Sequence, residues 1–136
     1  MNRVVQPRGW PRPKGYANVI AAEGRMVFTS GIVGWDQAGN FPAGFLPQVR
    51  QALVNVRDIL AEAGAAPKDL VRLTWYVVDV EMYLSSPKEP GRIYRACLGD
   101  HFLAMAVVEV RRLVEKQALL EIEATAVVDD HAGGLG

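Results

Sequence analysis

The sequence predicts an α+β sandwich, in which a mixed β-sheet packs two helices against one of its faces. Its elements follow the order strand, strand, helix, strand, helix, strand, strand, so strands outnumber helices and several neighbours can join as hairpins. The chain has 136 residues, half of them hydrophobic, which is enough for one domain with its own core and leaves no room for a second. Such a sheet leaves one face bare, and we expect the domain to cover that face by association.

Residues 1–15 are expected to form an extended, irregular arm, because prolines and glycines alternate there with basic side chains. Trp10 lies within this arm, and a large aromatic side chain in a polar segment usually has a surface to pack on. That surface belongs either to the same domain or to a neighbouring subunit. The globular domain is expected to span residues 16–129, followed by a flexible tail at 130–136.

Two apolar runs, at 17–22 and 26–30, flank a turn at 23–25 and predict a β-hairpin. Gly31 follows the second run. A bend or bulge at this glycine is favoured over the close approach of a ligand, although the lack of a side chain permits both. Residues 32–44 are rich in glycine and polar side chains, so we expect a loop there.

An amphipathic helix is expected from Pro47 to a C-terminal cap at Gly64. Its apolar side chains recur at helical spacing and form one stripe: Val49, Leu53, Val56, Leu60 and Ala63, widened by Ala52 and Ile59. Nothing in the stripe resembles a cofactor-binding motif, so we assign it to the core.

A run of β-branched and aromatic residues at 70–78 predicts a central strand. Serines and prolines at 82–90 predict a turn region, and a second helix of about three turns is expected from Gly91 to the neighbourhood of His101. Cys97 lies on the apolar side of this helix and is interpreted as a small buried hydrophobe. His101, near the end of the helix, is expected either to interact with the helix dipole or to face solvent.

The C-terminal third predicts two strands, at 104–112 and 118–128. In the second strand, apolar residues alternate with Glu121, Glu123 and Thr125, the period of two that separates a core face from the opposite face. Carboxylates are poor strand formers, so the two glutamates need a reason. The pattern alone favours a solvated or subunit-facing sheet face over the alternative, a general base held on a rigid strand.

Composition and motifs disfavour several function classes. Fifteen basic side chains balance fifteen acidic ones, so no overall field attracts nucleic acid or an anionic membrane. A single cysteine, and no apolar run long enough for a membrane span or a signal peptide, predict a reducing, cytoplasmic setting. The sequence lacks a phosphate-binding loop, a dinucleotide fingerprint and a nucleophile elbow, and neither His101 nor His131 has a second ligand at metal spacing. We therefore expect no metal and no cofactor.

Three segments carry a family resemblance: Met-Val-Phe-Thr-Ser-Gly at 26–31, the helix through 55–64, and Leu-Glu-Ile-Glu-Ala at 120–124. They are similar to the RidA/YjgF family of imine deaminases, members of which were once described as translation inhibitors or L-PSP endoribonucleases. The similarity extends from about Tyr16 to Val128. It implies a ferredoxin-like, chorismate-mutase-like ββαβαββ fold, assembled as a homotrimer with a ligand pocket at each subunit interface.

The resemblance also implies site residues. Deaminases of this family hydrolyse reactive 2-imino acids to 2-oxo acids and ammonia, with a glutamate near the attacking water, and Glu121 matches that glutamate. The predicted substrate-binding residues are Tyr16, Ser30, Gly31, Ile32, Tyr94, Met105 and Val107, the last of which stands where the family has a cysteine.

Met105 stands where the family has an arginine that grips the substrate carboxylate. A thioether supplies neither the charge nor the donors of a guanidinium, and losing one partner of a desolvated anion costs about 2 to 5 kcal/mol. Unless Arg12, Arg95, Arg111 or a neighbouring subunit supplies a substitute, we expect poor activity on 2-imino acids and an apolar, adaptable pocket floor. A lengthened segment at 85–89 is expected to reshape the pocket rim.

Two hypotheses from different classes stay open, so the sequence leaves undecided whether the protein is an enzyme. In the first, a trimer binds a small metabolite at interface pockets and hydrolyses an imine or enamine to a carbonyl compound and ammonia, with Glu121 assisting water. In the second, the trimer binds a small molecule without catalysis, and Glu121 is structural. Ribonuclease activity or translation inhibition is disfavoured by the neutral charge and by the lack of a basic-aromatic stripe.

Overall fold

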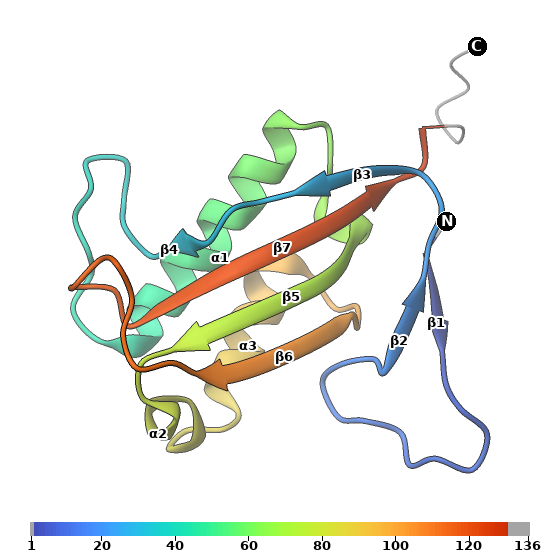
Figure 1. Cartoon of the computed structure of the whole chain (residues 1–136), viewed down its shortest axis with the longest axis horizontal. Helices are drawn as coiled ribbons and strands as arrows, with labels where there is room; N and C mark the ends of the chain where they lie inside the picture. Colours follow the sequence, from blue (N-terminus) through green and yellow to red (C-terminus); the bar gives the residue numbers. More distant parts are fainter. Residues whose placement is uncertain (1, 131–136) are drawn as a thin grey trace.

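A computed structural model describes residues 2–130 and confirms an α+β fold built on a mixed sheet (Figure 1). The expected tail from residue 131 onward, with His131, lies outside the described residues. The strands are β1 (Arg3–Val5), β2 (Val19–Ala21), β3 (Arg25–Phe28), β4 (Ile32–Val33), β5 (Leu70–Val77), β6 (Ala104–Glu109) and β7 (Leu120–Val128). The helices are α1 (Phe45–Glu62), α2 (Val80–Leu84) and α3 (Glu89–Leu98), with a short 3-10 helix η1 (Pro67–Asp69).

The main sheet has the order β3-β7-β5-β6, and β4 also pairs with β7. The central strand β5 is parallel to β6 and antiparallel to β7, which makes the sheet mixed. Helices α1 and α3 lie together behind the sheet in Figure 1, and the face toward the viewer carries no helix. The predicted layers, with two main helices on one face of a mixed sheet, are therefore confirmed.

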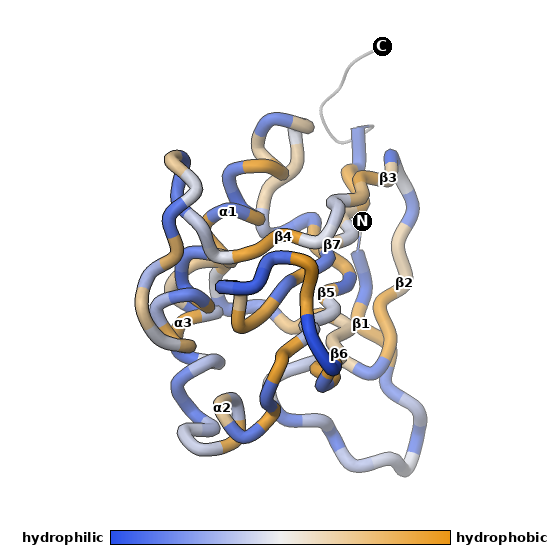
Figure 2. Tube along the Cα trace, turned by 60° about the vertical axis from the view of Figure 1, so that its left-hand side comes forward, coloured by the Kyte–Doolittle hydropathy of each residue, from blue (hydrophilic) through white to orange (hydrophobic). Residues whose placement is uncertain are grey.

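The alternation in β7 has the predicted consequence. Leu120, Ile122, Ala124 and Ala126 are buried beneath the helices, whereas Glu121, Glu123 and Thr125 lie on the open face. The stripe of α1 is also buried, except for Ala63, which is half-buried and caps the helix, and Ile59, which is 44% exposed. Ile59 was wrongly assigned to the core, because no layer covers that side of α1 and the side chain lines a surface depression there. Figure 2 shows the apolar colour concentrated in strands and helices, with polar segments in the connections.

The predicted hairpin of 17–22 with 26–30 is wrong. Strand β2 pairs with β1, so part of the arm is regular and forms a separate two-stranded ribbon, whereas β3 pairs with β7. Gly24 permits the second pairing, since a Cβ on it would overlap the backbone carbonyl of Val128. In Figure 1 the ribbon stands beside the main sheet as a separate unit.

The predicted turn region at 82–90 is only partly a turn, because α2 extends into its beginning and α3 starts before its end. Asp79 caps α2 by accepting a hydrogen bond from the backbone N–H of Glu81 at 3.0 Å. Helix α3 ends at Gly99, whose φ of 95° suits a residue without a side chain. His101 therefore lies beyond the helix rather than in its last turn.

Two smaller features complete the framework. Cys97 is buried, as interpreted, and its burial raises the pKa of the thiol. Within residues 2–130 no helix is both long and apolar enough to cross a membrane.

Candidate functional site

The residues that the sequence assigned to one site form two groups on opposite faces of the sheet. In the strand register, Glu121 lies opposite Tyr76 of β5, whereas Met105 lies opposite Leu73. Tyr76 and Leu73 are an odd number of residues apart, so their side chains point to opposite faces. A single subunit therefore does not bring Glu121 and Met105 together.

The first group lies at the edge where β4 joins β7. Ile32 and Val33, expected to be in a loop, form β4 opposite Ile122 and Glu121. Gly31 precedes β4, and a Cβ on it would overlap the carboxylate of Glu121. The glycine therefore serves close approach by a side chain of its own subunit, a role that neither alternative derived from the sequence had included.

The two glutamates of β7 have different surroundings. Glu123 accepts a hydrogen bond from the hydroxyl of Tyr76, and this bond is the main reason why the pKa of Tyr76 is raised. Glu121 is half-buried and has no hydrogen-bond or ion-pair partner within residues 2–130. Because no described side chain engages its carboxylate, Glu121 is the stronger candidate of the two for accepting a proton from a bound molecule.

A surface depression of about 440 Å³ adjoins this edge. Ser30, Gly31 and Ile32 form one wall, and α1 forms the other. Asn55 of α1 holds the two walls together, because its side-chain amide donates to the carbonyls of Val33, at 3.0 Å, and Trp35, at 2.8 Å. Glu121 lies behind Gly31 and does not line the depression itself.

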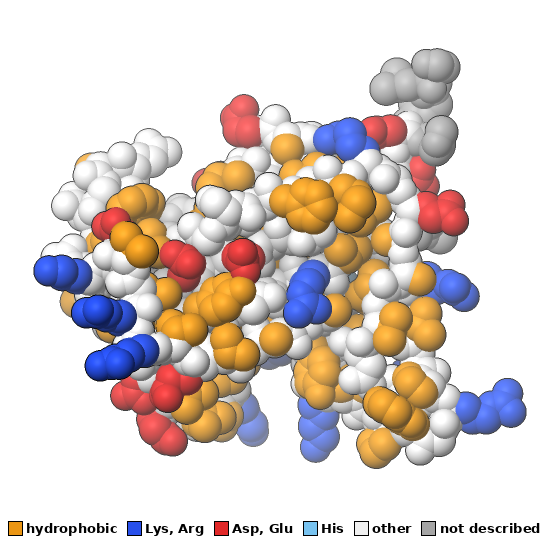
Figure 3. Space-filling view, in the orientation of Figure 1, with side chains coloured by type: hydrophobic (Ala, Val, Ile, Leu, Met, Phe, Trp, Pro, Cys, Tyr) orange, Lys and Arg blue, Asp and Glu red, His pale blue; other side chains and the backbone are white. Residues whose placement is uncertain are grey.

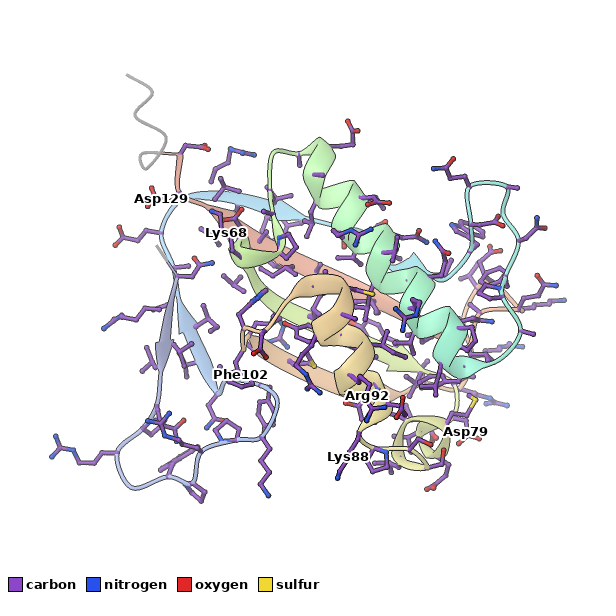
Figure 4. The ribbon with its side chains drawn as sticks, turned by 180° about the vertical axis from the view of Figure 1, so that it is seen from behind. Lys68, Asp79, Lys88, Arg92, Phe102 and Asp129 are labelled. Atoms are coloured by element: carbon purple, nitrogen blue, oxygen red, sulfur yellow. The ribbon has the colours of Figure 1, made fainter. Side chains whose placement is uncertain are left out.

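The second group borders a cavity of about 340 Å³ on the helix side of β6. Its walls come from residues 14–16 of the arm, the connection between α2 and α3, one side of α3, and residues 100–102. Trp75 and Met105 form its floor, from the neighbouring strands β5 and β6. In Figure 4, which shows the helix side, Lys88 and Arg92 lie at the start of α3 and Phe102 lies near the β1–β2 ribbon.

Backbone contacts place Tyr16 beside Met105. The N–H of Ala17 donates to the carbonyl of Leu103 at 2.9 Å, and Ala17 forms an isolated parallel bridge with Ala104. The segment between β1 and β2 thus crosses the beginning of β6 and brings the phenol of Tyr16 to the cavity.

Tyr94 contributes a buried wall to the cavity. Its hydroxyl donates to the carbonyl of His101 at 3.0 Å, and its burial raises the pKa of the phenol strongly, so the side chain stays uncharged. Val107, the remaining predicted site residue, lies opposite Trp75 in the register and lines neither the cavity nor the depression.

Met105 itself is uncharged, but several basic side chains line the same cavity. The cavity is lined by four basic side chains and one acidic one: Lys14, Lys88, Arg92, Arg95 and Asp100. Of the substitutes considered from the sequence, Arg95 is at the cavity, Arg12 is not, and Arg111 lines a different depression beside Val78. The expectation that the lengthened segment shapes the rim agrees with Pro87 lying in the wall.

Several of these wall residues were missed by sequence reasoning. Trp75 was assigned only to a strand, and Lys88 and Arg92 only to a turn and a helix start. For the basic residues the sequence does contain one signal, their helical spacing, which places Lys88, Arg92 and Arg95 on one side of α3. Within residues 2–130, no group of three or more histidine, cysteine, aspartate or glutamate side chains could hold a metal ion.

Comparison with known proteins places this geometry in a family. The sequence matches the family described as endoribonuclease L-PSP over residues 11–128. It is 38% identical over 105 residues to a RutC family protein of Haemophilus influenzae, and 36% identical over 108 residues to a 2-iminobutanoate/2-iminopropanoate deaminase of Escherichia coli. Each of these alignments covers 76% of this chain and 80% of the relative.

Comparison of the fold with known structures agrees with the sequence matches. The crystal structure of YyfB, a protein of the conserved Rid family from Yersinia pestis, superposes with a TM-score of 0.80 at 30% identity. The superposition covers 93% of this chain and 98% of YyfB. The sequence match, the relatives and the shared fold therefore establish that this chain belongs to the RidA/YjgF family.

Proposed function

We propose that the protein is a homotrimeric hydrolase of small imines or enamines, in which Glu121 of one subunit works beside the cavity of a neighbouring subunit. The observation that carries the proposal is the contrast within β7: Glu123 is engaged by Tyr76, whereas the carboxylate of Glu121 has no partner among residues 2–130 of its own subunit and lies against Gly31. The deaminase among the relatives supports the reaction class.

Assembly is part of the proposal because, within one subunit, Glu121 and Met105 lie on opposite faces of the sheet. The open face exposes large apolar side chains, among them Met26, Phe28 and Val108. Figure 3 shows such side chains over β3 and toward the ribbon, with charged groups between them. A second copy on this face would bury them and could bring Tyr16 and Met105 of its own cavity to Glu121. Trp10, 62% exposed in its own subunit, would gain the surface expected for it.

In the reaction, the Glu121 carboxylate accepts a proton from water while the water oxygen adds to the carbon of the C=N bond. An enamine first tautomerises to the imine. The proton held by Glu121 passes to the nitrogen as the carbinolamine forms, and the carbinolamine hydroxyl then gives its proton, through Glu121, to the departing nitrogen. The carbon–nitrogen bond then breaks, giving a carbonyl compound and ammonia, and Glu121 returns to its ionised form. General-base assistance of this kind contributes about 10²- to 10⁴-fold to a rate.

The experiment compares Glu121→Gln with Glu123→Gln on an imine generated in situ, with 2-aminoacrylate as the first substrate. Release of the 2-oxo acid and ammonia is followed. We expect wild-type turnover, at least a hundredfold loss in Glu121→Gln, and less than about tenfold loss in Glu123→Gln. Equal losses in the two variants, or full turnover in Glu121→Gln, would contradict the role of Glu121.

A second candidate function, ligand binding without catalysis, is favoured by one observation. Met105 removes the guanidinium that the family's deaminases direct at the substrate carboxylate. A wild type that binds a ligand but releases no ammonia from any imine would support this candidate over the hydrolase.

A further inference from the structure

The cavity on the helix side of β6 contains hydrogen-bonding groups that nothing in the proposed reaction uses. Trp75 Nε1 and His101 Nε2 are buried and have no hydrogen-bond partner within residues 2–130. Trp75 is only 1% exposed, and both side chains line the cavity. A buried donor without a partner costs about 1 to 3 kcal/mol, so the indole N–H of Trp75 favours a bound molecule with an acceptor group.

The charges around the cavity favour an anion. Arg92 is already paired with Glu89 at 2.8 Å, but Lys14, Lys88 and Arg95 have no ion-pair partner within residues 2–130. The guanidinium of Arg95 lies over Gly91, since its Nη1 atom is 3.4 Å from the place of a Cβ on that glycine, and Gly91 itself lines the cavity. Arg95 can therefore reach a carboxylate at the mouth.

The interior of the cavity favours an apolar, planar body. Trp75 and Tyr83 meet edge to face, with ring centroids 5.8 Å apart, and Tyr94, Phe102 and Met105 add to the wall. Burial raises the pKa of the phenols of Tyr83 and Tyr94, so neither introduces a negative charge. The volume of about 340 Å³ lies in the range of small-molecule sites.

We propose that this cavity binds a small aromatic carboxylic acid within one subunit, with Arg95 holding the carboxylate and Trp75 and the other rings holding the apolar part. Arg95 thereby takes the place of the guanidinium that Met105 lacks. As the acid-binding part of the proposed hydrolase, the inference rests on the proposed function for its biological meaning, but binding itself requires neither Glu121 nor hydrolysis.

The probe is phenylacetate, compared with its neutral isostere 2-phenylacetamide and with acetate, by titration calorimetry on the full-length protein. We expect phenylacetate to bind, and the amide and acetate to bind at least about tenfold more weakly, because each lacks one half of the recognition. The indole N–H resonance of Trp75, assigned with Trp75→Phe, should shift when phenylacetate is added. Undetectable binding of phenylacetate, or equal affinity for acid and amide, would overturn the proposal.

Arg95→Gln tests the anchor, and Arg50→Gln is the matched control, since Arg50 is an exposed arginine on α1 that does not line the cavity. We expect at least about tenfold weaker phenylacetate binding in Arg95→Gln and less than about twofold change in Arg50→Gln. Equal affinities in the two variants would overturn the role of Arg95. Both changes are on exposed side chains, and thermal melting checks that each variant is folded.

Glu121→Gln separates this inference from the proposed function. Phenylacetate binding retained in Glu121→Gln, together with no imine turnover in the wild type, would leave the cavity assignment standing and remove the hydrolase. Imine turnover in the wild type without phenylacetate binding would leave the hydrolase standing and remove the cavity assignment.

Discussion

At the scale of single residues, Glu121 and Glu123 show how one sequence pattern produces two chemical roles. Both follow the same period-two rule and both face the open side of the sheet. Their difference comes from the neighbouring segments, because β5 offers Glu123 the hydroxyl of Tyr76, whereas the approach to β4 offers Glu121 only the backbone of Gly31. The spacing of the two glutamates in the sequence does not predict either of these neighbours.

Gly31→Ala and Gly24→Ala should therefore separate activity from stability. In Gly31→Ala the atoms nearest to the new Cβ belong to the flexible Glu121 side chain, so we expect lost turnover with a Tm change below about 4 °C. In Gly24→Ala the Cβ meets the backbone of Val128 at a φ of 146°, and we expect destabilisation by about 1 to 3 kcal/mol.

Thermal melting and imine turnover of both glycine variants test this expectation. Full turnover in Gly31→Ala would show that the position of the Glu121 carboxylate does not matter. A Tm loss in Gly31→Ala as large as that in Gly24→Ala would show that the glycine serves the fold instead.

At the scale of elements, the sequence predicted those parts whose cause is local. The stripe of α1 and the alternation of β7 follow from helix and strand periodicity within one segment, and both were right except at Ile59 and Ala63. Strand pairing has no such local cause. The partner of β2 turned out to be β1, because β3 joins the core through its contact with β7.

The cavity was also beyond sequence reasoning, for the same physical reason. Met105 and Trp75 become neighbours only through the parallel pairing of β5 with β6, and residues 14–16 reach them only through the bridge at Ala17. The sequence nevertheless identified Tyr16, Tyr94 and Met105, because the family resemblance supplied the long-range information.

Helix α3 gives a pH-dependent prediction through Tyr94. Burial raises the pKa of its phenol above the ordinary value of 10.0. The contribution of the neutral phenol to the stability of the folded protein is therefore fully present below pH 10.0 and is lost as the pH rises toward the raised pKa. We expect Tyr94→Phe to be less stable than the wild type by about 0.5 to 1.5 kcal/mol at neutral pH, because its hydrogen bond to His101 is lost.

Above pH 10.0 the difference between Tyr94→Phe and wild type should narrow, since only the wild type must keep this phenol protonated. Denaturant unfolding of both proteins between pH 8 and 11 measures the difference, and the raised pKa of Cys97 affects both equally. A difference that stays constant across this range would show that the phenol of Tyr94 titrates normally in the folded protein.

At the scale of the whole molecule, the open sheet face and the divided site both concern association. We expect light scattering to give a mass three times the 14.9 kDa of the chain. Phe28 is 66% exposed on this face, so Phe28→Glu should lower the mass toward that of one chain, because assembly would bury the new charge. Leu84→Glu, an equally drastic change on α2 at the helix side, should leave the mass unchanged.

A single-chain mass for the wild type, or a threefold mass in Phe28→Glu, would remove the open face as the assembly surface. Turnover measured on the same samples relates assembly to activity, since a dissociated protein should lose hydrolysis and keep phenylacetate binding.

The β1–β2 ribbon has a consequence for how ligands enter and leave. A two-stranded ribbon on its own is marginally stable in water, and here it forms a sheet separate from the main one while its connecting segment supplies residues 14–16 to the cavity. We therefore expect this wall of the cavity to open at a lower free energy than the main sheet does. A ligand can exchange through local opening of the ribbon while the main sheet stays folded, so residence time and global stability can be tuned independently.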